Sequence, residues 1–127
     1  MGDVYSVSEA NRQRKWDREE VVILVTEYFR SKKWTNENIV ENQKEISRFL
    51  KKREQMITGM IPEEIFRNYA GICMQYGNVR CLDPETPYYG MHGSKLQKQI
   101  VQEYLEDPNA LEVEAALIYQ KYGEDEE

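Results

Sequence analysis

The strongest constraint on the fold is a helix start signal that precedes an apolar stretch near the N-terminus. Asp17 is a good N-cap residue and Glu20 follows three residues later, which makes a variant of the capping box. Trp16 and Val21 occupy the two positions of a hydrophobic staple around this cap. The signal predicts a helix over residues 18–33. Its apolar stripe at helical spacing consists of Val21, Leu24, Val25, Tyr28 and Phe29.

Later parts of the chain also carry helix signals, whereas strand signals are poor. The only β-branched run, residues 21–25, has helical flanks. Asn68 is a suitable N-cap, Ser94 and Gln97 form a second capping box, and Gly123 is a stop signal. The further helices predicted from spacing and caps are 39–55, 69–81, one that starts after Ser94, and 109–122.

These signals predict an all-α protein, built as a small helical bundle of four to five helices. A length of 127 residues suits one domain. We expect an N-terminal arm over 1–15, a single helical domain over 16–122 and an acidic tail over 123–127. The first three helices are predicted to form a helix-turn-helix or Myb-like trihelical core.

The charge of the chain is unevenly distributed. The net charge is −6, yet the stretch from residue 102 to the C-terminus holds nine acids and one lysine, so the remainder is slightly basic. The bases form two clusters, one over 12–18 and one over 44–53. The chain carries no secretory signal pattern and no apolar run of membrane-spanning length, so the sequence predicts a cytoplasmic protein without membrane contact.

Catalytic and metal-binding chemistry has little support. The chain has one histidine, His92, and two cysteines, Cys73 and Cys81, which is too few ligands for a structural zinc site. It has neither a P-loop nor a dinucleotide-binding glycine pattern. We therefore expect no enzyme activity, no cofactor and no metal.

The segment over 66–83 mixes side-chain amides and arginines with apolar positions, as a DNA-reading helix requires. The residues predicted to contact base edges are Arg67, Asn68, Gln75, Asn78 and Arg80. The residues predicted to contact phosphates are Arg12, Arg14, Lys15, Lys51, Lys52, Arg53 and Lys95. A purely structural interpretation pairs Arg67 with Glu63 or Glu64. Under either interpretation, the core is predicted to contain Trp16, Trp34 and Phe49.

Three motifs in this order resemble a known domain. Trp16 begins a W-D-R-E-E sequence, Phe66 begins an F-R-N-x-x-G-I-x-M segment that leads to Leu82-Asp83, and Gly90 begins a G-x-x-G-S-K segment. The succession over 16–104 is similar to the N-terminal helical domain of bacterial HNH restriction-type endonucleases of the McrA-like group. The resemblance implies a prokaryotic or phage protein that handles DNA, without the nuclease domain. Gln75-Tyr76 replaces a commoner lysine-leucine pair, which removes a positive charge.

Two functions from different classes remain open. The first is a non-catalytic module of a restriction or defence-related protein that binds double-stranded DNA with the helix around 68–81. The second is a small acidic protein-interaction factor that inhibits or regulates a nuclease or another basic, nucleic-acid-binding protein. Its contact residues are predicted to be Glu103, Glu106, Asp107 and Glu112. The apolar line of the last helix also suits a homodimer.

Overall fold

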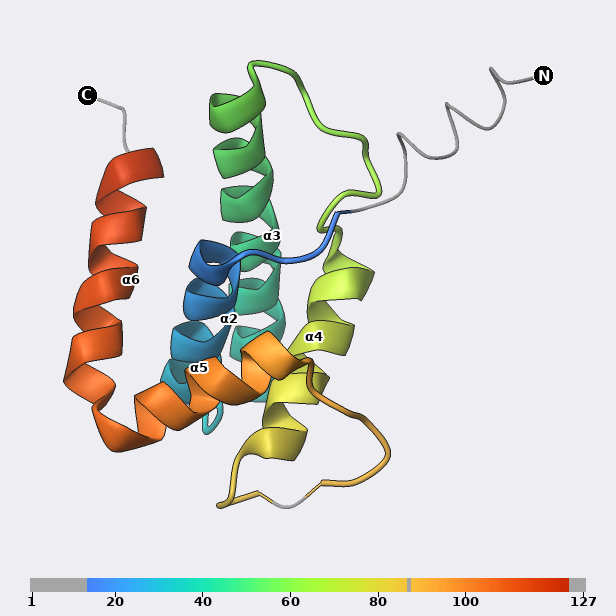
Figure 1. The fold of residues 1–127 in the computed structure, drawn as a ribbon. Coiled ribbons are helices and arrows are strands. Elements are labelled where there is room, and N and C mark those ends of the chain that lie inside the picture. Colours follow the sequence, from blue (N-terminus) through green and yellow to red (C-terminus); the bar gives the residue numbers. More distant parts are fainter. Residues whose placement is uncertain (1–13, 87, 124–127) are drawn as a thin grey trace.

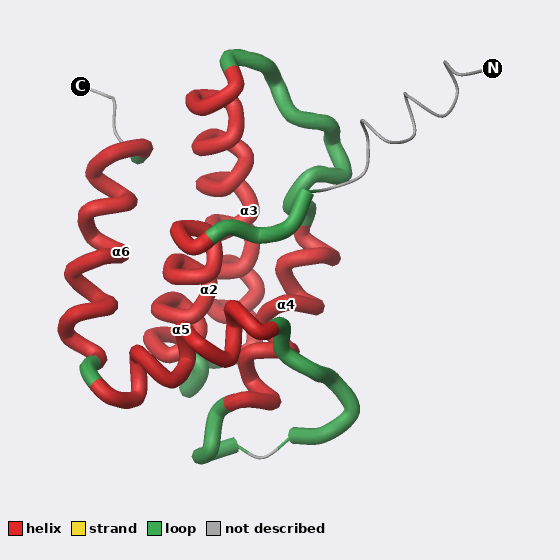
Figure 2. Tube along the Cα trace, in the orientation of Figure 1, coloured by secondary structure: helices red, strands yellow, loops and turns green. Residues whose placement is uncertain are grey.

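The protein is described by a computed structural model that places residues 14–86 and 88–123 (Figure 1). This part of the chain contains helices and no strand (Figure 2), which confirms the predicted all-α bundle. The helices are α2 (Arg18–Ser31), α3 (Asn36–Thr58), α4 (Tyr69–Leu82), α5 (Lys95–Glu106) and α6 (Pro108–Tyr122). Most of the predicted arm and tail, including Arg12, lies outside the described residues.

The predicted caps set the helix starts. At α2, the Glu20 amide donates to Asp17 Oδ1 and the Asp17 amide donates to Glu20 Oε1, so the capping box is complete. Ser94 and Gln97 form the same reciprocal pair at α5. Asn68 caps α4 by accepting from the Gly71 amide at 2.9 Å. These caps explain why sequence signals located three helix starts to within a residue.

Helix α3 is longer at both ends than the predicted 39–55. It begins at Asn36 because Thr35 caps it. The Thr35 side chain accepts a hydrogen bond from the Asn38 amide. It ends at Thr58 because Gly59 adopts φ +77°, a left-handed conformation that suits glycine. The extra C-terminal turn carries α3 beyond the core.

Helix α2 is the centre of the bundle, since it contacts each of the other four described helices. Residues 21–25 are buried on every side, with no exposed surface at all. The predicted one-sided stripe is therefore too narrow, because Val22 and Ile23 are as buried as the stripe residues. A helix that is covered all round needs apolar residues all round. This requirement explains why residues 21–25 form a continuous apolar run like that of a buried strand.

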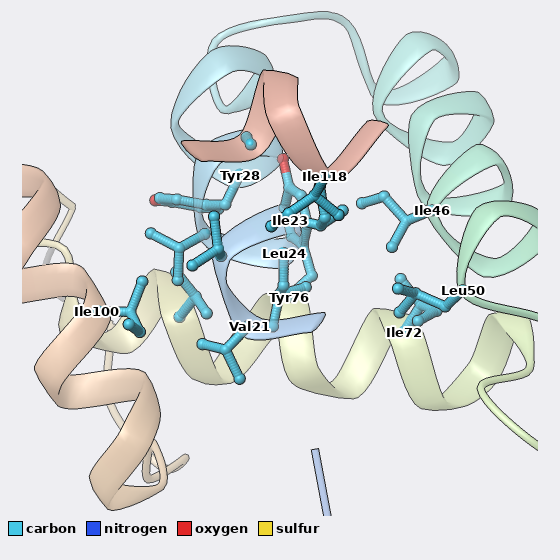
Figure 3. Close-up of a cluster of buried hydrophobic side chains, with 14 of the residues drawn as sticks. Val21, Ile23, Leu24, Tyr28, Ile46, Leu50, Ile72, Tyr76, Ile100 and Ile118 are labelled. Atoms are coloured by element: carbon cyan, nitrogen blue, oxygen red, sulfur yellow. The ribbon is translucent and has the colours of Figure 1, made fainter. Parts of the chain in front are cut away.

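Side chains from all five helices meet in one core around α2 (Figure 3). Phe49 and Trp16 pack against this core, as predicted. Trp34 does not. It follows the end of α2, is 38% exposed, and stacks under the Arg30 guanidinium at 4.7 Å. Its prediction as a core residue is therefore wrong.

The helix-turn-helix core is not confirmed. Residues 32–35 join α2 to α3 within a short turn, but residues 59–68 separate α3 from α4. A helix-turn-helix joins its two helices with about 3–4 residues. The longer connection arches away from the C-terminal end of α3 before it returns to α4 (Figure 1).

None of the helices in the described part of the chain combines the length and hydropathy that a bilayer crossing requires.

Asp83 ties the end of α4 to the end of α2. Its Oδ2 accepts hydrogen bonds from the Tyr28 hydroxyl at 2.7 Å and from Lys32 Nζ at 2.8 Å, and its Oδ1 accepts from the Glu85 amide. Burial acts to raise the pKa of Asp83, but the bonds from Lys32 and Tyr28 outweigh it and lower the pKa below its ordinary value. Burial also raises the pKa of Tyr28 to about 12.

We expect Asp83→Asn to lower the free energy of unfolding at pH 7 by about 1–3 kcal/mol, because a buried network loses its negative charge and one of its two acceptor oxygens. A carboxyl with a lowered pKa stabilises the fold above its unfolded pKa of about 4, and this contribution is lost as the pH falls through the folded value. The variant should therefore lose less stability than the parent between pH 7 and pH 3. Urea unfolding of both proteins at pH 7 and at pH 3 measures this difference. If the free energy of unfolding falls equally in the two proteins, Asp83 does not have the lowered pKa described here.

Candidate functional site

A buried ion pair lies at the N-terminal end of α2, where the motifs that begin at Trp16 and Phe66 meet. Glu20 is fully buried, and its two carboxylate oxygens accept from Arg67 Nε at 2.9 Å and Arg67 Nη2 at 3.1 Å. The Arg67 guanidinium lies between two aromatic rings, 4.7 Å from the centre of Trp16 and 4.4 Å from that of Phe66. Trp16, Glu20, Phe66 and Arg67 thus form one unit, which we call the Arg67 cluster.

The backbone at Arg67 supports a structural role for this cluster. Its φ is +46°, a left-handed conformation that costs a non-glycine residue about 1 kcal/mol or more. The Arg67 carbonyl accepts from Ser47 Oγ at 2.7 Å, which fixes the peptide against α3. Strain of this kind persists where surrounding contacts determine the conformation.

Two of the predicted DNA contacts are therefore in the wrong place. Arg67 is 1% exposed and Arg53 is 4% exposed, so neither guanidinium lies on a surface that DNA reaches. Arg53 donates to Asp17 and Glu19, and one of its nitrogens lies 3.9 Å from Glu20. The alternative pairing of Arg67 with Glu63 or Glu64 is also wrong, because the partner is Glu20, 47 positions earlier in the sequence.

The predicted amides of α4 are half-buried and engaged with one another. Gln75 Oε1 accepts from Asn78 Nδ2 at 3.1 Å and from Gln97 Nε2 at 2.6 Å, which links α4 to α5. Asn68 is used as the cap, and the Arg80 guanidinium stacks 5.0 Å from the Tyr88 ring. The exposed residues of α4 are uncharged: Tyr69, Ala70 and Met74.

The remaining predicted cations come from the segment before α2, from α3 and from the start of α5. Arg14 bonds Glu20 and Glu54, while Lys15 and Lys95 are exposed. Lys51 and Lys52 lie on the solvent side of the C-terminal half of α3. Of the predicted base-reading and phosphate-binding residues, Arg53 and Arg67 are therefore buried, and Gln75 and Asn78 bond each other.

The predicted acidic contacts lie at the corner between α5 and α6. Glu103 and Glu106 line one groove there together with Asp107, which caps α6 through the Ala110 amide. Arg18 partly neutralises this groove through a 2.7 Å bond to Glu103. Glu112, on α6, is exposed but does not line this groove.

An exposed apolar surface, which sequence reasoning missed, lies where α3 ends and the connection to α4 begins. Five large apolar side chains within ten residues are at least half exposed, the most exposed being Ile61 at 81% and Met60 at 70%. We call this the Ile61 surface. It consists of Met56, Ile57, Met60, Ile61 and Ile65. The available signal was a set of apolar residues around two helix breakers, Gly59 and Pro62, where a polar loop is usual.

Anchors at both ends hold the Ile61 surface in place. Thr58 Oγ1 bonds both the amide and the carbonyl of Met60, which fixes the turn after α3. The far end is held by buried Phe66 and by the Arg67 cluster. The connection runs from the end of α3 to this cluster, and along it Met60, Ile61 and Ile65 are at least half exposed.

A groove with cationic side chains runs beside this surface, between α3 and residues 61–64. It is lined by Arg48, Lys51, Lys52, Gln55, Ile61, Pro62 and Glu64. We call it the Lys51 groove. Lys51 Nζ donates to the Glu64 carbonyl at 3.0 Å, and Lys52 Nζ donates to the Gly123 carbonyl at 2.8 Å. Both ammonium groups are thus positioned by carbonyl oxygens.

Metal ligands do not gather in residues 14–86 and 88–123: no group of three or more histidine, cysteine, aspartate or glutamate side chains is arranged to hold an ion there. His92 is exposed in the loop before α5. Cys73 and Cys81 are half-buried thiols on α4, and Cys73 Sγ lies 3.5 Å from Gln43 Oε1.

The comparisons with known proteins add no identification. No family model, no curated protein and no solved structure matches the chain. In the geometry of the molecule, the first two motifs of the resemblance contribute the buried Glu20, Phe66 and Arg67, whereas the side chains of the Ile61 surface are exposed.

Proposed function

We propose that the protein is a non-catalytic module that binds another protein through the Ile61 surface. The observation that carries this proposal is the exposure of five large apolar side chains, two on the last turn of α3 and three on the connection that follows it, which is anchored at both ends. Contiguous exposed apolar patches on soluble proteins mark interaction sites. A preformed patch also loses little conformational freedom when it binds, which favours affinity.

The chemistry of α4 supports a protein partner over a base-reading role. Reading DNA in the major groove requires amides and guanidinium groups that reach base edges. Here Gln75 and Asn78 bond each other and Arg67 is interior. The exposed residues of the same helix are uncharged. The apolar content of the Ile61 surface, by contrast, suits the desolvated centre of a protein interface.

Capture of a partner from a lysate of cells that naturally make the chain tests this function. We expect Met60→Ser with Ile61→Ser to reduce the captured partner by at least about tenfold, because truncated central contacts dominate an interface. The matched control is Val113→Ser with Leu117→Ser, which removes two apolar side chains of α6 that are each more than half exposed. Capture that is equal for the two variants, or that is lost after DNA digestion, would contradict the proposal.

Double-stranded DNA is the second candidate, favoured by Arg48, Lys51 and Lys52 along one side of α3. Such a row suits phosphate contacts without base reading. A mobility shift on mixed duplex DNA separates the candidates. The protein-binding proposal predicts only weak binding, with a Kd of about 10⁻⁴ to 10⁻⁶ M, that declines steeply with salt. A sequence-preferring complex of nanomolar affinity would assign the chain to DNA.

A further inference from the structure

The Lys51 groove adds a charge preference to the Ile61 surface. One wall is a helical row in which Arg48, Lys51, Lys52 and Gln55 follow each other at helical spacing. The other wall is Ile61 and Pro62. A ligand in this groove therefore meets cations on one side and apolar surface on the other.

The charges of Lys51 and Arg48 are available to a ligand of the groove. Lys51 donates to a neutral carbonyl, and within the described ranges, 14–86 and 88–123, it forms no ion pair. The Arg48 pair with Glu45 is an exposed pair one turn apart on α3, with both side chains more than half exposed. Exposed pairs of this kind contribute little and are readily exchanged. Among the described residues that line the groove, three are cationic and one, Glu64, is a carboxylate.

Positioning of the ammonium groups favours binding further. The carbonyl bonds of Lys51 and Lys52 restrict two long side chains that would otherwise lose rotamer freedom on binding. A carboxylate in the groove would form charge-assisted hydrogen bonds with them, which are shorter and stronger than bonds between neutral groups.

We propose that the Lys51 groove and the Ile61 surface together bind an acidic segment of a partner protein, one in which apolar side chains are flanked by carboxylates. The inference rests on the proposed protein-binding function and names the chemistry of its partner. The apolar side chains of the segment cover Ile61, Met60 and Met56, while its carboxylates face Arg48, Lys51 and Lys52. Charge of this kind selects among apolar partners and accelerates association.

Panning of phage-displayed random peptides of about twelve residues on the immobilised full chain tests this inference. We expect the recovered peptides to be enriched in both acidic and large apolar residues. A labelled synthetic copy of a recovered peptide should bind at least about tenfold more weakly to Lys51→Gln with Lys52→Gln, and more weakly at about 0.3 M salt than at about 0.05 M. The control variant is Lys95→Gln with Lys98→Gln, which removes two exposed lysines from α5.

Several outcomes would overturn the inference. These are the absence of enriched peptides, enrichment of peptides without carboxylates, and equal recovery on the Lys51–Lys52 variant. Self-association of the chain that the same variant abolishes would assign the groove to a second copy instead. If panning fails while lysate capture still requires Met60 and Ile61, the partner is a protein of another chemistry and only the acidic assignment is rejected.

Discussion

Glu20→Gln is expected to lower the free energy of unfolding by about 3–5 kcal/mol, because it leaves the interior guanidinium of Arg67 without its counter-charge. Glutamine has the shape of glutamate and is accepted at the third position of a capping box, so the cap at Asp17 is retained. The loss therefore reports the charge of the buried carboxylate, which also accepts from Arg14 and lies 3.9 Å from Arg53. Urea unfolding followed by circular dichroism measures it.

Two further variants separate the ion pair from general damage. Glu63→Gln changes an exposed carboxylate and should alter the free energy of unfolding by less than about 0.5 kcal/mol. Replacing both partners, with Glu20→Leu and Arg67→Met, should destabilise less than the sum of the two single changes, because no buried charge remains unpaired. A loss below about 1 kcal/mol for Glu20→Gln would show that the pair is not buried as described.

Ile23→Ala is expected to lower the free energy of unfolding by about 2–5 kcal/mol, as much as Leu24→Ala, because both side chains are fully buried in α2. An amphipathic α2 with the stripe read from the sequence would make these two substitutions unequal, since Ile23 would face solvent. The pair therefore tests whether α2 is surrounded on all sides.

The control for this comparison is Val113→Ala on α6, where the side chain is half exposed. It should change the free energy of unfolding by less than about 0.5 kcal/mol. Denaturant unfolding of the three variants under one condition gives the comparison. If Ile23→Ala costs less than about 1 kcal/mol while Leu24→Ala costs more than about 2, the bundle does not enclose α2.

Local signals predicted the secondary structure well. Caps act through neighbouring residues, so Asp17, Asn68 and Ser94 could be recognised from the sequence and all three start helices. The all-α class followed from them. The length of α3 was underestimated, because the periodic apolar pattern stops before the helix does. Its last turn continues to Thr58 and carries apolar residues into solvent.

Tertiary features were less predictable. The partner of Arg67 lies 47 positions earlier in the sequence. From the sequence alone, an arginine that bonds a buried carboxylate cannot be distinguished from one that bonds a phosphate. Spacing alone also suggested that Val22 and Ile23 face outward, since the number of helices packed around α2 cannot be read from α2 itself. The exposure of Ile61 depends on the path of the connection from α3 to the Arg67 cluster, which the pattern of breakers does not specify.

The surface that contacts the partner is the central claim, and site-specific photo-crosslinking in cells that naturally make the chain tests it most directly. A photoreactive residue is placed at position 61 in one variant and at position 74, the exposed methionine of α4, in another. We predict a protein adduct from position 61 and none from position 74. A DNA adduct from position 74, with no protein adduct from position 61, would contradict the account.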